Sequence, residues 1–595
     1  MVLKINGLTL ALGEREDLLP VRVASLLGLP DGAIADIRVI RRSIDARRTR
    51  PPRFVYLLVV RLADGVDWRP APERERAGVS VIEGMDGPDE SPHADSPGLA
   101  LLTSFPRPPL SFPRIPDQGP GQARESGKGN SIPHQPRNDT EYPAACGGVV
   151  YSQAGSAVFE RRPVVAGCGP AGIFAALTLA EKGIPVLLLE RGRAVPERLA
   201  DVRAFWEQGI LNPESHVHFG EGGAGTFSDG KLTSRVKNPC TSRVKRIFVD
   251  MGAPADILVD ARPHIGTDRL REVVVNLRKR LIGLGGEVRF GARVTDFRIH
   301  QGCLAGIVIN GSEELRTGHL ILATGQSADD TYRKLAERGV ALEPKPFAIG
   351  LRVEHPQELI NRIQYGRWAG HPDLPPADYF LTAKVAKTDR SCYSFCMCPG
   401  GQVIGCSAEA GGVITNGMSG LRRESPCANS AVVVNVRNED LGGEGPLAGL
   451  AFRRHWEERA FLAGGSDYRA PAQRLTDFLS GKTHSPIGRC SFLPGVKGAD
   501  LREVLPPFVV EGLKRGFAEF ERKMPGFITG EAILIGVETR TSSPVRITRG
   551  EDGQGVNLTG FYPCGEGAGY AGGIISSALD GIRAAERIML SLTNP

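Results

Sequence analysis

The hydrophobic pattern of this chain is clearest between residues 163 and 190. Apolar runs at 163–167 and 185–190 flank a glycine-rich turn and an alanine-rich apolar stretch at 173–180, and the second run ends on an acid, Glu190. Short apolar runs are typical of buried strands, and a longer apolar stretch is typical of a buried helix. The pattern therefore predicts a strand, a tight turn, a helix and a second strand in succession.

The turn has the sequence GCGPAG at 167–172, and Glu190 follows its first glycine by 23 positions. In a dinucleotide-binding unit, Gly167 permits the sharp turn, Gly169 lets the backbone approach a pyrophosphate, and Gly172 lets helix and strand pack closely. Pro170 suits the first helical turn, the pyrophosphate lies on the positive end of the helix, and Glu190 accepts a hydrogen bond from a ribose hydroxyl. The cofactor residues predicted here are Gly167, Gly169, Pro170, Ala171, Gly172, Glu190 and Arg191.

The regions before this unit differ from one another in pattern. Residues 1–75 read as a small α/β unit, with a helix expected at 18–27 between strands at 3–10 and 54–60. Residues 76–159 are rich in proline, glycine and serine and have almost no periodicity. We expect this segment to be a disordered or loosely docked linker.

The remainder alternates between regular and irregular segments. A helix with apolar residues at helical spacing is expected at 267–284, and a last helix at 574–589. The less regular middle, richer in proline, cysteine and aromatic residues, is interpreted as an inserted α+β domain on the substrate side. The predicted divisions are 1–75, 76–159, 160–344 for the first part of the dinucleotide-binding domain, 345–500 for the insertion, and 501–595 for the C-terminal part.

A second glycine cluster, CGEGAGYAGG at 564–573, lies after a short apolar run and before the last helix. It is not interpreted as a second nucleotide-binding unit, because no further strand with an acid follows it. We expect the N-terminus of that helix to point at the pyrimidine end of a flavin, where its dipole would stabilise negative charge, and Glu566 to bind a ribityl hydroxyl. The residues predicted to contact cofactor are Gly565, Glu566, Gly572, Gly573 and Ile574.

Several long motifs resemble the bacterial and plastid family of uncharacterised FAD-dependent dehydrogenases. The resemblance implies FAD, an N-terminal ferredoxin-like α/β domain and a Rossmann-like core of the glutathione-reductase type with an insertion; it implies no particular substrate. Two departures are that Glu566 stands where related flavoproteins often have Asp, and that residues 327–331 read SADDT where the family has SARDT. The motifs are RSIDAR at 42–47, FGEGGAGTFSDGKL at 219–232, PHIGTD at 263–268, KPFAIGLRVEHPQELI at 345–360, YSFCMCPGG at 393–401, TNGMS at 415–419, VETRTSSPVRI at 537–547 and GEGAGYAGGI at 565–574.

The resemblance places the loop at 222–226 and the strand end at 322–325 against the flavin. The expected contacts are Gly222, Gly223, Thr226, Thr324 and Gly325, although glycines often mark nothing more than a surface turn. Catalytic residues are not identified; the candidates are Lys231, Glu538 and Arg540. An arginine at the ring would clamp a substrate carboxylate in two-point fashion, whereas Lys231 is equally well explained as a solvated side chain.

Four cysteines, Cys392, Cys396, Cys398 and Cys406, are clustered in sequence. Their spacing does not match the usual zinc pattern, and no metal is expected. On a strand, Cys396 and Cys398 would share one face, which leaves two readings open: core packing, which we favour, and a redox thiol pair.

Composition bounds the function classes. A net charge of +6 over 595 residues does not by itself indicate a nucleic-acid partner, and no apolar run is long enough to span a bilayer. The 11 cysteines are scattered, which favours a reducing, cytoplasmic location. The chain is interpreted as an oxidoreductase, a dehydrogenase with non-covalent FAD, acting on an unidentified small molecule with NAD(P)H as a transient electron donor.

Two rival functions stay open. Seven arginines between residues 38 and 53 could neutralise phosphates in an RNA-associated flavoprotein of the tRNA-modifying type, although a solvated basic edge is the simpler reading. Residues 1–75 could instead dock a redox partner protein that reduces the flavin.

Overall fold

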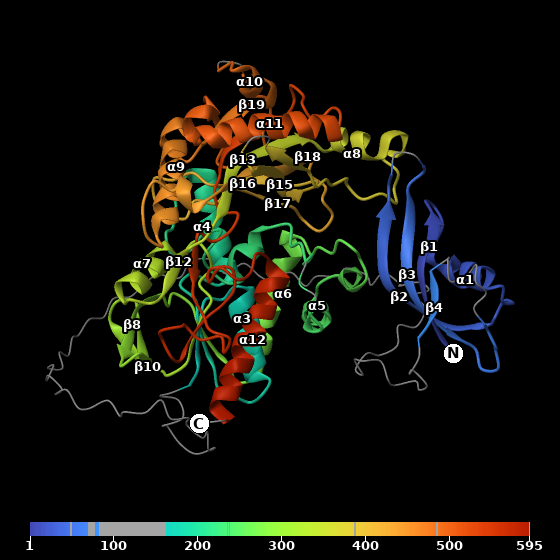
Figure 1. Cartoon of the computed structure of the whole chain (residues 1–595), viewed down its shortest axis with the longest axis horizontal. Coiled ribbons are helices and arrows are strands. Elements are labelled where there is room, and N and C mark those ends of the chain that lie inside the picture. Colours follow the sequence, from blue (N-terminus) through green and yellow to red (C-terminus); the bar gives the residue numbers. More distant parts are fainter. Residues whose placement is uncertain are drawn as a thin grey trace, which may run out of the picture.

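The computed structural model describes residues 1–47, 50–69, 78–82, 162–234, 236, 238–385, 388–483 and 486–593. Figure 1 shows three parts: a small N-terminal sheet, a parallel sheet flanked by helices, and a larger sheet domain lying over the edge of the parallel sheet. Most of the predicted linker lies outside the described residues.

The N-terminal part is an antiparallel sheet with strand order β2-β3-β1-β4, the order of a ferredoxin-like fold. Alternate residues of its central strand, Leu58, Val60 and Leu62, are buried because one face of the sheet is covered. Since β4 pairs with β1, this domain extends past the predicted limit at residue 75. Its elements are β1 (Val2–Ala11), α1 (Leu19–Leu27), β2 (Ile34–Asp45), β3 (Arg53–Leu62) and β4 (Val79–Val81).

This domain docks on the rest of the chain mainly through Arg42, with a further hydrogen bond from the Gly13 N–H to Asp373. The Arg42 N–H donates to the Val259 carbonyl, and the Ala261 N–H donates to the Arg42 carbonyl, both at 2.8 Å. The Arg42 side chain pairs with Asp256 and Asp260. One of the seven arginines noted in the sequence is therefore a docking residue.

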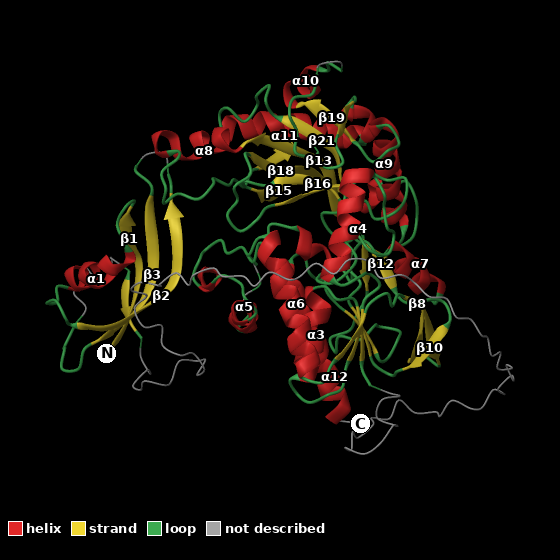
Figure 2. Ribbon diagram, turned by 180° about the vertical axis from the view of Figure 1, so that it is seen from behind, coloured by secondary structure: helices red, strands yellow, loops and turns green. Residues whose placement is uncertain are grey.

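The central part contains a five-stranded sheet in which every neighbouring pair is parallel, with the order β23-β11-β5-β6-β7. Helices α3, α6 and α12 lie side by side on one face, as Figure 2 shows, and an antiparallel meander covers the other. Both faces are buried, so the strands are uniformly apolar rather than alternating. This is the predicted Rossmann-type α/β architecture. The elements are β5 (Val164–Ala166), α3 (Pro170–Ala180), β6 (Leu187–Leu189), α6 (Thr267–Gly283), β7 (Glu287–Arg289), β8 (Val294–His300), β9 (Cys303–Ile309), β10 (Glu313–Arg316), β11 (Leu320–Leu322), β23 (Phe561–Pro563) and α12 (Ile574–Thr593).

The third part is built on a seven-stranded, mainly antiparallel sheet with the order β14-β15-β18-β13-β21-β19-β20. Helix α11 packs across β13, β14, β15 and β18, and the hairpin β16–β17 lies beside the sheet (Figure 1). The elements are β13 (Phe347–Pro356), α8 (Gln357–Tyr365), β14 (Thr382–Val385), β15 (Arg390–Cys398), β16 (Gln402–Gly405), β17 (Thr415–Met418), β18 (Cys427–Val436), α9 (Ala448–Gly464), β19 (Ala470–Arg474), α10 (Leu475–Ser480), β20 (Val496–Gly498), α11 (Pro507–Lys523) and β21 (Ile533–Glu538).

The predicted boundary at residue 500 is wrong in this structure. Strand β21 lies between β13 and β19 inside the seven-stranded sheet, so residues 501–538 belong to the inserted domain. The chain returns to the parallel sheet through β22 (Val545–Ile547), which pairs with β12 (Leu342–Pro344). The connections between the two domains are thus themselves paired, which ties one domain to the other.

Other elements complete the path: α4 (Val195–Gln208), the short helix η3 (Gly223–Phe227), α5 (Cys240–Asp250), η4 (Ala255–Leu258) and α7 (Asp329–Glu337). None of the helices in the described part of the chain has the length and apolar character that crossing a bilayer requires.

Candidate functional site

Three turns meet at the carboxyl edge of the parallel sheet. They follow β5 at Gly167, β11 at Thr324 and Gly325, and β23 at Gly565. A Cβ placed on Gly167 would lie 2.3 Å from the Ala323 carbonyl and 3.1 Å from Thr324 Cα, so these turns pack backbone against backbone. Ligands of open α/β sheets bind at this edge.

The glycines of the first turn serve two different purposes. Gly167 adopts φ +108, and a Cβ on Gly172 would lie 1.8 Å from the Gly167 carbonyl oxygen, so both are required for packing. A Cβ on Gly169 would instead meet only Gly223 Cα, at 3.9 Å. The space beside Gly169 is therefore open at the N-terminus of α3, whose first residue is Pro170.

The glycines of the other two turns show the same division. A Cβ on Gly567 would lie 2.6 Å from the Gly325 carbonyl oxygen, and one on Gly565 would lie 2.9 Å from Ala171 Cβ. Positions Gly325, Gly572 and Gly573 have nothing within 4 Å of an added Cβ. Together with Gly169, these glycines leave an open backbone surface along one edge of the sheet. That surface, lined by two helix N-termini, fits a dinucleotide that carries a pyrophosphate.

Glu190 organises the first turn. Its Oε2 accepts a hydrogen bond from the Cys168 N–H at 2.8 Å, and its Oε1 accepts from Gly192 and Gly220 at 2.9 Å each. The carboxylate assigned to a ribose hydroxyl is thus engaged with three backbone groups, and Oε2 keeps one further accepting position. The side chain is buried at the end of β6, where the fingerprint requires the acid.

The Arg191 guanidinium is paired with carboxylates of the protein itself. Its Nε lies 3.0 Å from Glu214 Oε2, its Nη1 lies 3.0 Å from Asp330 Oδ1, and its guanidinium stacks over Phe219 at 4.0 Å. The structure therefore gives it a structural role beside the turn.

The loop at 222–226 is not a surface turn. The Gly222 N–H donates to the Cys168 carbonyl at 2.8 Å, and a Cβ on Gly223 would lie 3.1 Å from Gly169 Cα. Thr226 is buried and donates its hydroxyl to the Glu221 carbonyl. On its other side, the loop reaches Ile574, the first residue of α12. The loop thus connects the first turn with the second glycine cluster.

Glu566 lies within the second cluster. Gln326 Nε2 donates to Glu566 Oε1 at 2.7 Å, and burial raises the pKa of Glu566 to about 7. Ser327 Oγ, just beyond Gln326, is buried without a hydrogen-bond partner among the residues the structure describes. These polar groups lie where the open backbone edge meets the inserted domain.

Glu538, at the end of β21, is paired within the inserted domain. Arg352 donates to both of its carboxylate oxygens, at 2.8 and 3.0 Å, and Thr415 Oγ1 donates at 2.9 Å. Both charged side chains are almost completely buried. The Glu538 charge is therefore balanced by the protein itself.

Arg540 also differs from the expectation of a substrate clamp. Its Nε and Nη2 each lie 3.0 Å from Glu457 of α9, and its Nη1 lies 3.4 Å from Asp329. Arg453 donates to the same Asp329 oxygen at 2.7 Å. A buried network of four charged side chains occupies this position, and the Arg540 guanidinium is already engaged with two carboxylates.

The Lys231 side chain is partly exposed, but its amino group is buried. Its Nζ lies 2.7 Å from Asp229 Oδ2, with one third of the side chain exposed. Burial disfavours its charge, but Cys398, Asp229 and Cys396 outweigh burial and raise the pKa of Lys231. Among the three catalytic candidates, Lys231 is the one whose amino group lies near two thiols, those of Cys396 and Cys398, in addition to its ion pair with Asp229.

The four clustered cysteines have different environments. Cys392 packs against α11, where a Cβ on Gly516 would lie 2.2 Å from its Sγ, and Cys406 is buried with its Sγ 3.6 Å from the Ile414 carbonyl. These two match core packing. Cys396 and Cys398 form a separate pair. In the described part of the chain, no group of three or more His, Cys, Asp or Glu side chains could hold a metal.

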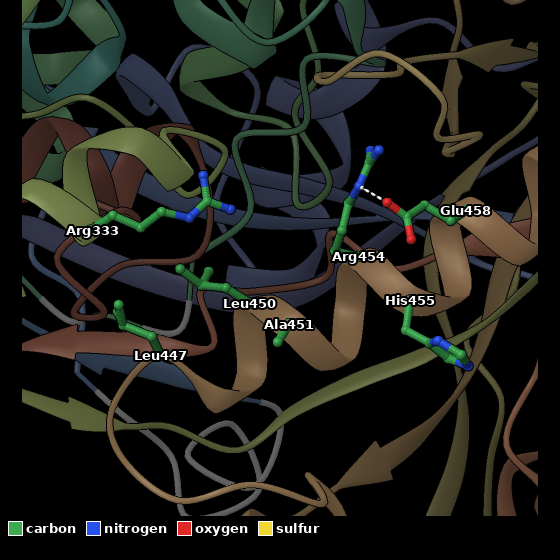
Figure 3. A pocket seen from close by; sticks show the side chains of 7 residues that line it. All are labelled: Arg333, Leu447, Leu450, Ala451, Arg454, His455 and Glu458. Carbon is green, nitrogen blue, oxygen red and sulfur yellow. Dashed lines mark hydrogen bonds and ion pairs between the residues drawn. The ribbon is translucent and has the colours of Figure 1, made fainter.

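A surface cavity of about 370 Å³ lies elsewhere, between α7 and α9. Figure 3 shows Arg333 of α7 facing Arg454 of α9, with Arg454 directed at Glu458. The cavity opens on the side of α9 that carries Arg454, whereas the buried ion network uses Arg453 and Glu457. The cavity is separate from the carboxyl edge of the parallel sheet, where the open glycines lie.

Sequence reasoning missed Arg352, Arg453 and Glu457. A signal existed for Arg352, because it interrupts the apolar strand β13 and a buried charge requires a partner. Arg453 and Glu457 are spaced by four residues on α9, but helical spacing alone does not say which face is buried.

Comparisons with known proteins match large parts of the chain. The family described as "FAD-dependent protein, C-terminal domain-like" matches residues 346–541, and a domain of unknown function matches residues 2–61. An uncharacterized protein of Clostridium beijerinckii is 48% identical over 439 residues, which is 73% of this chain and 82% of the relative.

Solved structures give weaker likenesses. The flavin-dependent brominase Bmp2 is similar over 73% of this chain and 80% of its own, with 14% identity and a TM-score of 0.33. A glycerol-3-phosphate dehydrogenase from Bacillus halodurans, complexed with FAD, is similar over 73% of this chain and 64% of its own, with 11% identity and a TM-score of 0.33. The fold assignment rests on the chain's own sheet order.

Proposed function

This chain belongs to a family of FAD-dependent proteins, the family of the Clostridium beijerinckii relative, and from that membership we propose that it is an FAD-dependent oxidoreductase, a dehydrogenase of a small molecule. FAD supplies the electron chemistry when bound, and the protein supplies binding, orientation and electrostatics.

One observation carries the proposal. The open glycines Gly169, Gly325, Gly572 and Gly573 line the carboxyl edge of the parallel sheet. The other glycines of the same turns, Gly167, Gly172, Gly565 and Gly567, are too tightly packed to accept a side chain. An extended dinucleotide placed there would run from the N-terminus of α3 to the N-terminus of α12. The two helix ends would stabilise negative charge, on the pyrophosphate and on the reduced ring respectively.

The chain's residues have distinct roles in this proposal. Glu190 holds the first turn in shape, the loop at 222–226 covers it, and Glu566 faces the junction with the inserted domain. The paired charges of Glu538 and Arg540 keep the inserted domain in position rather than taking part in the chemistry. Lys231 is the candidate that remains for contact with ring or substrate.

The RNA-associated alternative has less support. Arg42 is engaged in docking, and Arg47 and Arg50 pair with Asp45. A basic surface whose charges are matched internally neutralises fewer phosphates. We expect no shift of bulk tRNA at low salt; a salt-sensitive shift would favour this alternative. A redox partner docking on residues 1–82 stays a separate proposal, against which steady NADH oxidation by the isolated protein would count.

The test of the main proposal uses the purified protein. We expect one FAD per chain, released into the supernatant by acid precipitation, because the bond to the protein is not covalent. Anaerobic addition of NADH or NADPH should bleach the flavin band, and a suitable acceptor should restore it. Purification without flavin, or a bound flavin that no electron donor reduces, would contradict the proposal.

A further inference from the structure

Cys396 and Cys398 lie at an irregularity of strand β15. The register pairs Phe395 with Ala431 and Cys398 with Asn429, so three residue steps on β15 face two on β18. Cys396 adopts φ +47, a left-handed conformation that is uncommon for a residue with a side chain. Bulges of this kind redirect a side chain and are frequent beside active sites.

The two cysteines lie close together. Cys398 Sγ lies 3.4 Å from the Cys396 carbonyl oxygen, and both thiols act electrostatically on the same two cations, Lys231 and Arg352. Two glycines make room for Cys398, since a Cβ on Gly417 would lie 3.1 Å from its Sγ and one on Gly401 would lie 3.1 Å from its Cβ. Adjacent sulfurs are the first geometric requirement for a disulfide.

The charges around the pair favour a thiolate at Cys396. The hydrogen bond from Cys398 lowers the pKa of Cys396, the cations of Lys231 and Arg352 lower it further, and burial and Glu538 oppose them. The same hydrogen bond, with burial, raises the pKa of Cys398. One half-buried reactive thiol beside one fully buried thiol is the arrangement of an attacking and a resolving cysteine.

Cys396 and Cys398 lie near groups of both the parallel-sheet domain and the inserted domain. Cys396 acts electrostatically on Glu566 of the second glycine cluster as well as on Arg352 of β13. Lys231 follows the loop that covers the first turn. The pair thus lies where the open glycine edge meets the inserted domain, at the end expected for the flavin ring.

We propose that Cys396 and Cys398 form a redox-active dithiol that exchanges two electrons with the bound FAD, a proposal that rests on the proposed function. On oxidation, the two S–H bonds break and one S–S bond forms. The two electrons and two protons released pass to FAD as acceptor. In the reverse direction, the disulfide takes back two electrons and two protons and becomes two thiols again.

The first experiment counts electrons. Air-oxidised holoprotein is titrated anaerobically with dithionite, with the flavin band monitored. FAD alone accepts two electrons, and FAD with a disulfide accepts four, so the wild type should consume about twice the reductant that Cys396→Ser consumes. Cys392→Ala, which removes a packed thiol from the same strand, is the matched control and should behave like the wild type.

The second measurement needs no variant. Oxidised and reduced holoprotein are quenched in acid, alkylated and digested, and the peptide 391–422 is sequenced by mass spectrometry. We expect Cys396 and Cys398 to resist alkylation only in the oxidised sample, with Cys392 and Cys406 labelled in both. This readout holds even if Cys396→Ser fails to fold.

The outcomes separate the two proposals. Uptake of two electrons by wild-type protein, with Cys396 and Cys398 labelled in the oxidised sample, overturns the dithiol and leaves the flavin oxidoreductase intact. If wild type and Cys396→Ser both take up four electrons, the extra disulfide lies elsewhere. That result also overturns the dithiol proposal. Protein that carries no FAD overturns the proposed function, and the electron exchange with it.

Discussion

Substituting Gly169 by alanine should abolish tight FAD binding without unfolding the protein. An added Cβ would meet nothing in the protein closer than Gly223 Cα at 3.9 Å, and the backbone at this position, φ −81 and ψ −178, is accessible to any residue. The methyl group would instead occupy the space through which the pyrophosphate reaches the N-terminus of α3.

The size of the effect is set by the hydrogen bonds that a displaced pyrophosphate could no longer accept from the backbone. A hydrogen bond to a charged group contributes about 1.5–3 kcal/mol, so removing two would cost about 3–6 kcal/mol, a rise in Kd of roughly 100- to 20,000-fold. Alanine in place of glycine as the residue that caps a helix costs about 1 kcal/mol at most, so the stability of the apoprotein should change little.

The assay measures FAD affinity by fluorescence quenching and apoprotein stability by urea unfolding. Two other glycine-to-alanine variants serve as controls, one expected to change neither quantity and one expected to prevent folding. Gly283→Ala, where an added Cβ also meets nothing within 4 Å but lies far from the cofactor edge, should leave both quantities near wild type. Gly172→Ala, whose Cβ would lie 1.8 Å from the Gly167 carbonyl oxygen, should prevent folding. If Gly169→Ala binds FAD within threefold of wild type, the cofactor does not approach this turn.

Four further expectations follow from the same structure. Gly573→Pro removes an N–H donor at the start of α12 and should lower the flavin midpoint potential and weaken sulfite addition, an effect of roughly 0.3–2 kcal/mol; unchanged values with FAD fully bound would mean that this helix does not face the ring. The pKa of Glu566 is raised from 4.5 to about 7, so the folded apoprotein binds more protons than the unfolded chain and its stability should fall as pH rises through this window, by up to about 3 kcal/mol; urea unfolding against pH should show a flatter profile for Glu566→Gln. Arg352→Met leaves Glu538 buried without a partner and should cost about 3–5 kcal/mol in urea unfolding, whereas Arg352→Met with Glu538→Met should cost less; equal losses would argue against a paired role. Arg42→Ala should loosen the N-terminal domain, which small-angle scattering would register as a larger radius of gyration, with FAD content unchanged; an unaltered radius would show that other contacts hold the domain.

Much of the fold could be predicted because its signals are local. The order of apolar runs and glycines between Gly167 and Glu190 specifies a strand, a turn, a helix and a strand, and each step depends on residues within a few positions of one another. The ferredoxin-like order of the N-terminal sheet and the Rossmann-type core agree with the family resemblance. Boundaries were less accurate, since β4 and β21 are assigned by pairing with distant strands, a property that no local pattern contains.

The candidate site divides in the same way. The sequence by itself predicted an open turn directly before a helix N-terminus, where a pyrophosphate is expected, because Gly169, Pro170 and the α3 stretch are contiguous. It also marked Glu538, Arg540 and Lys231 as candidate catalytic residues. Which of them remain available for chemistry was decided only by the tertiary structure. Glu538 pairs with Arg352 across 186 positions and Arg540 pairs with Glu457 across 83. A charge is stable in the interior only when folding places an opposite charge against it, so the partner, and with it the role of the residue, depends on packing between segments that the sequence keeps far apart.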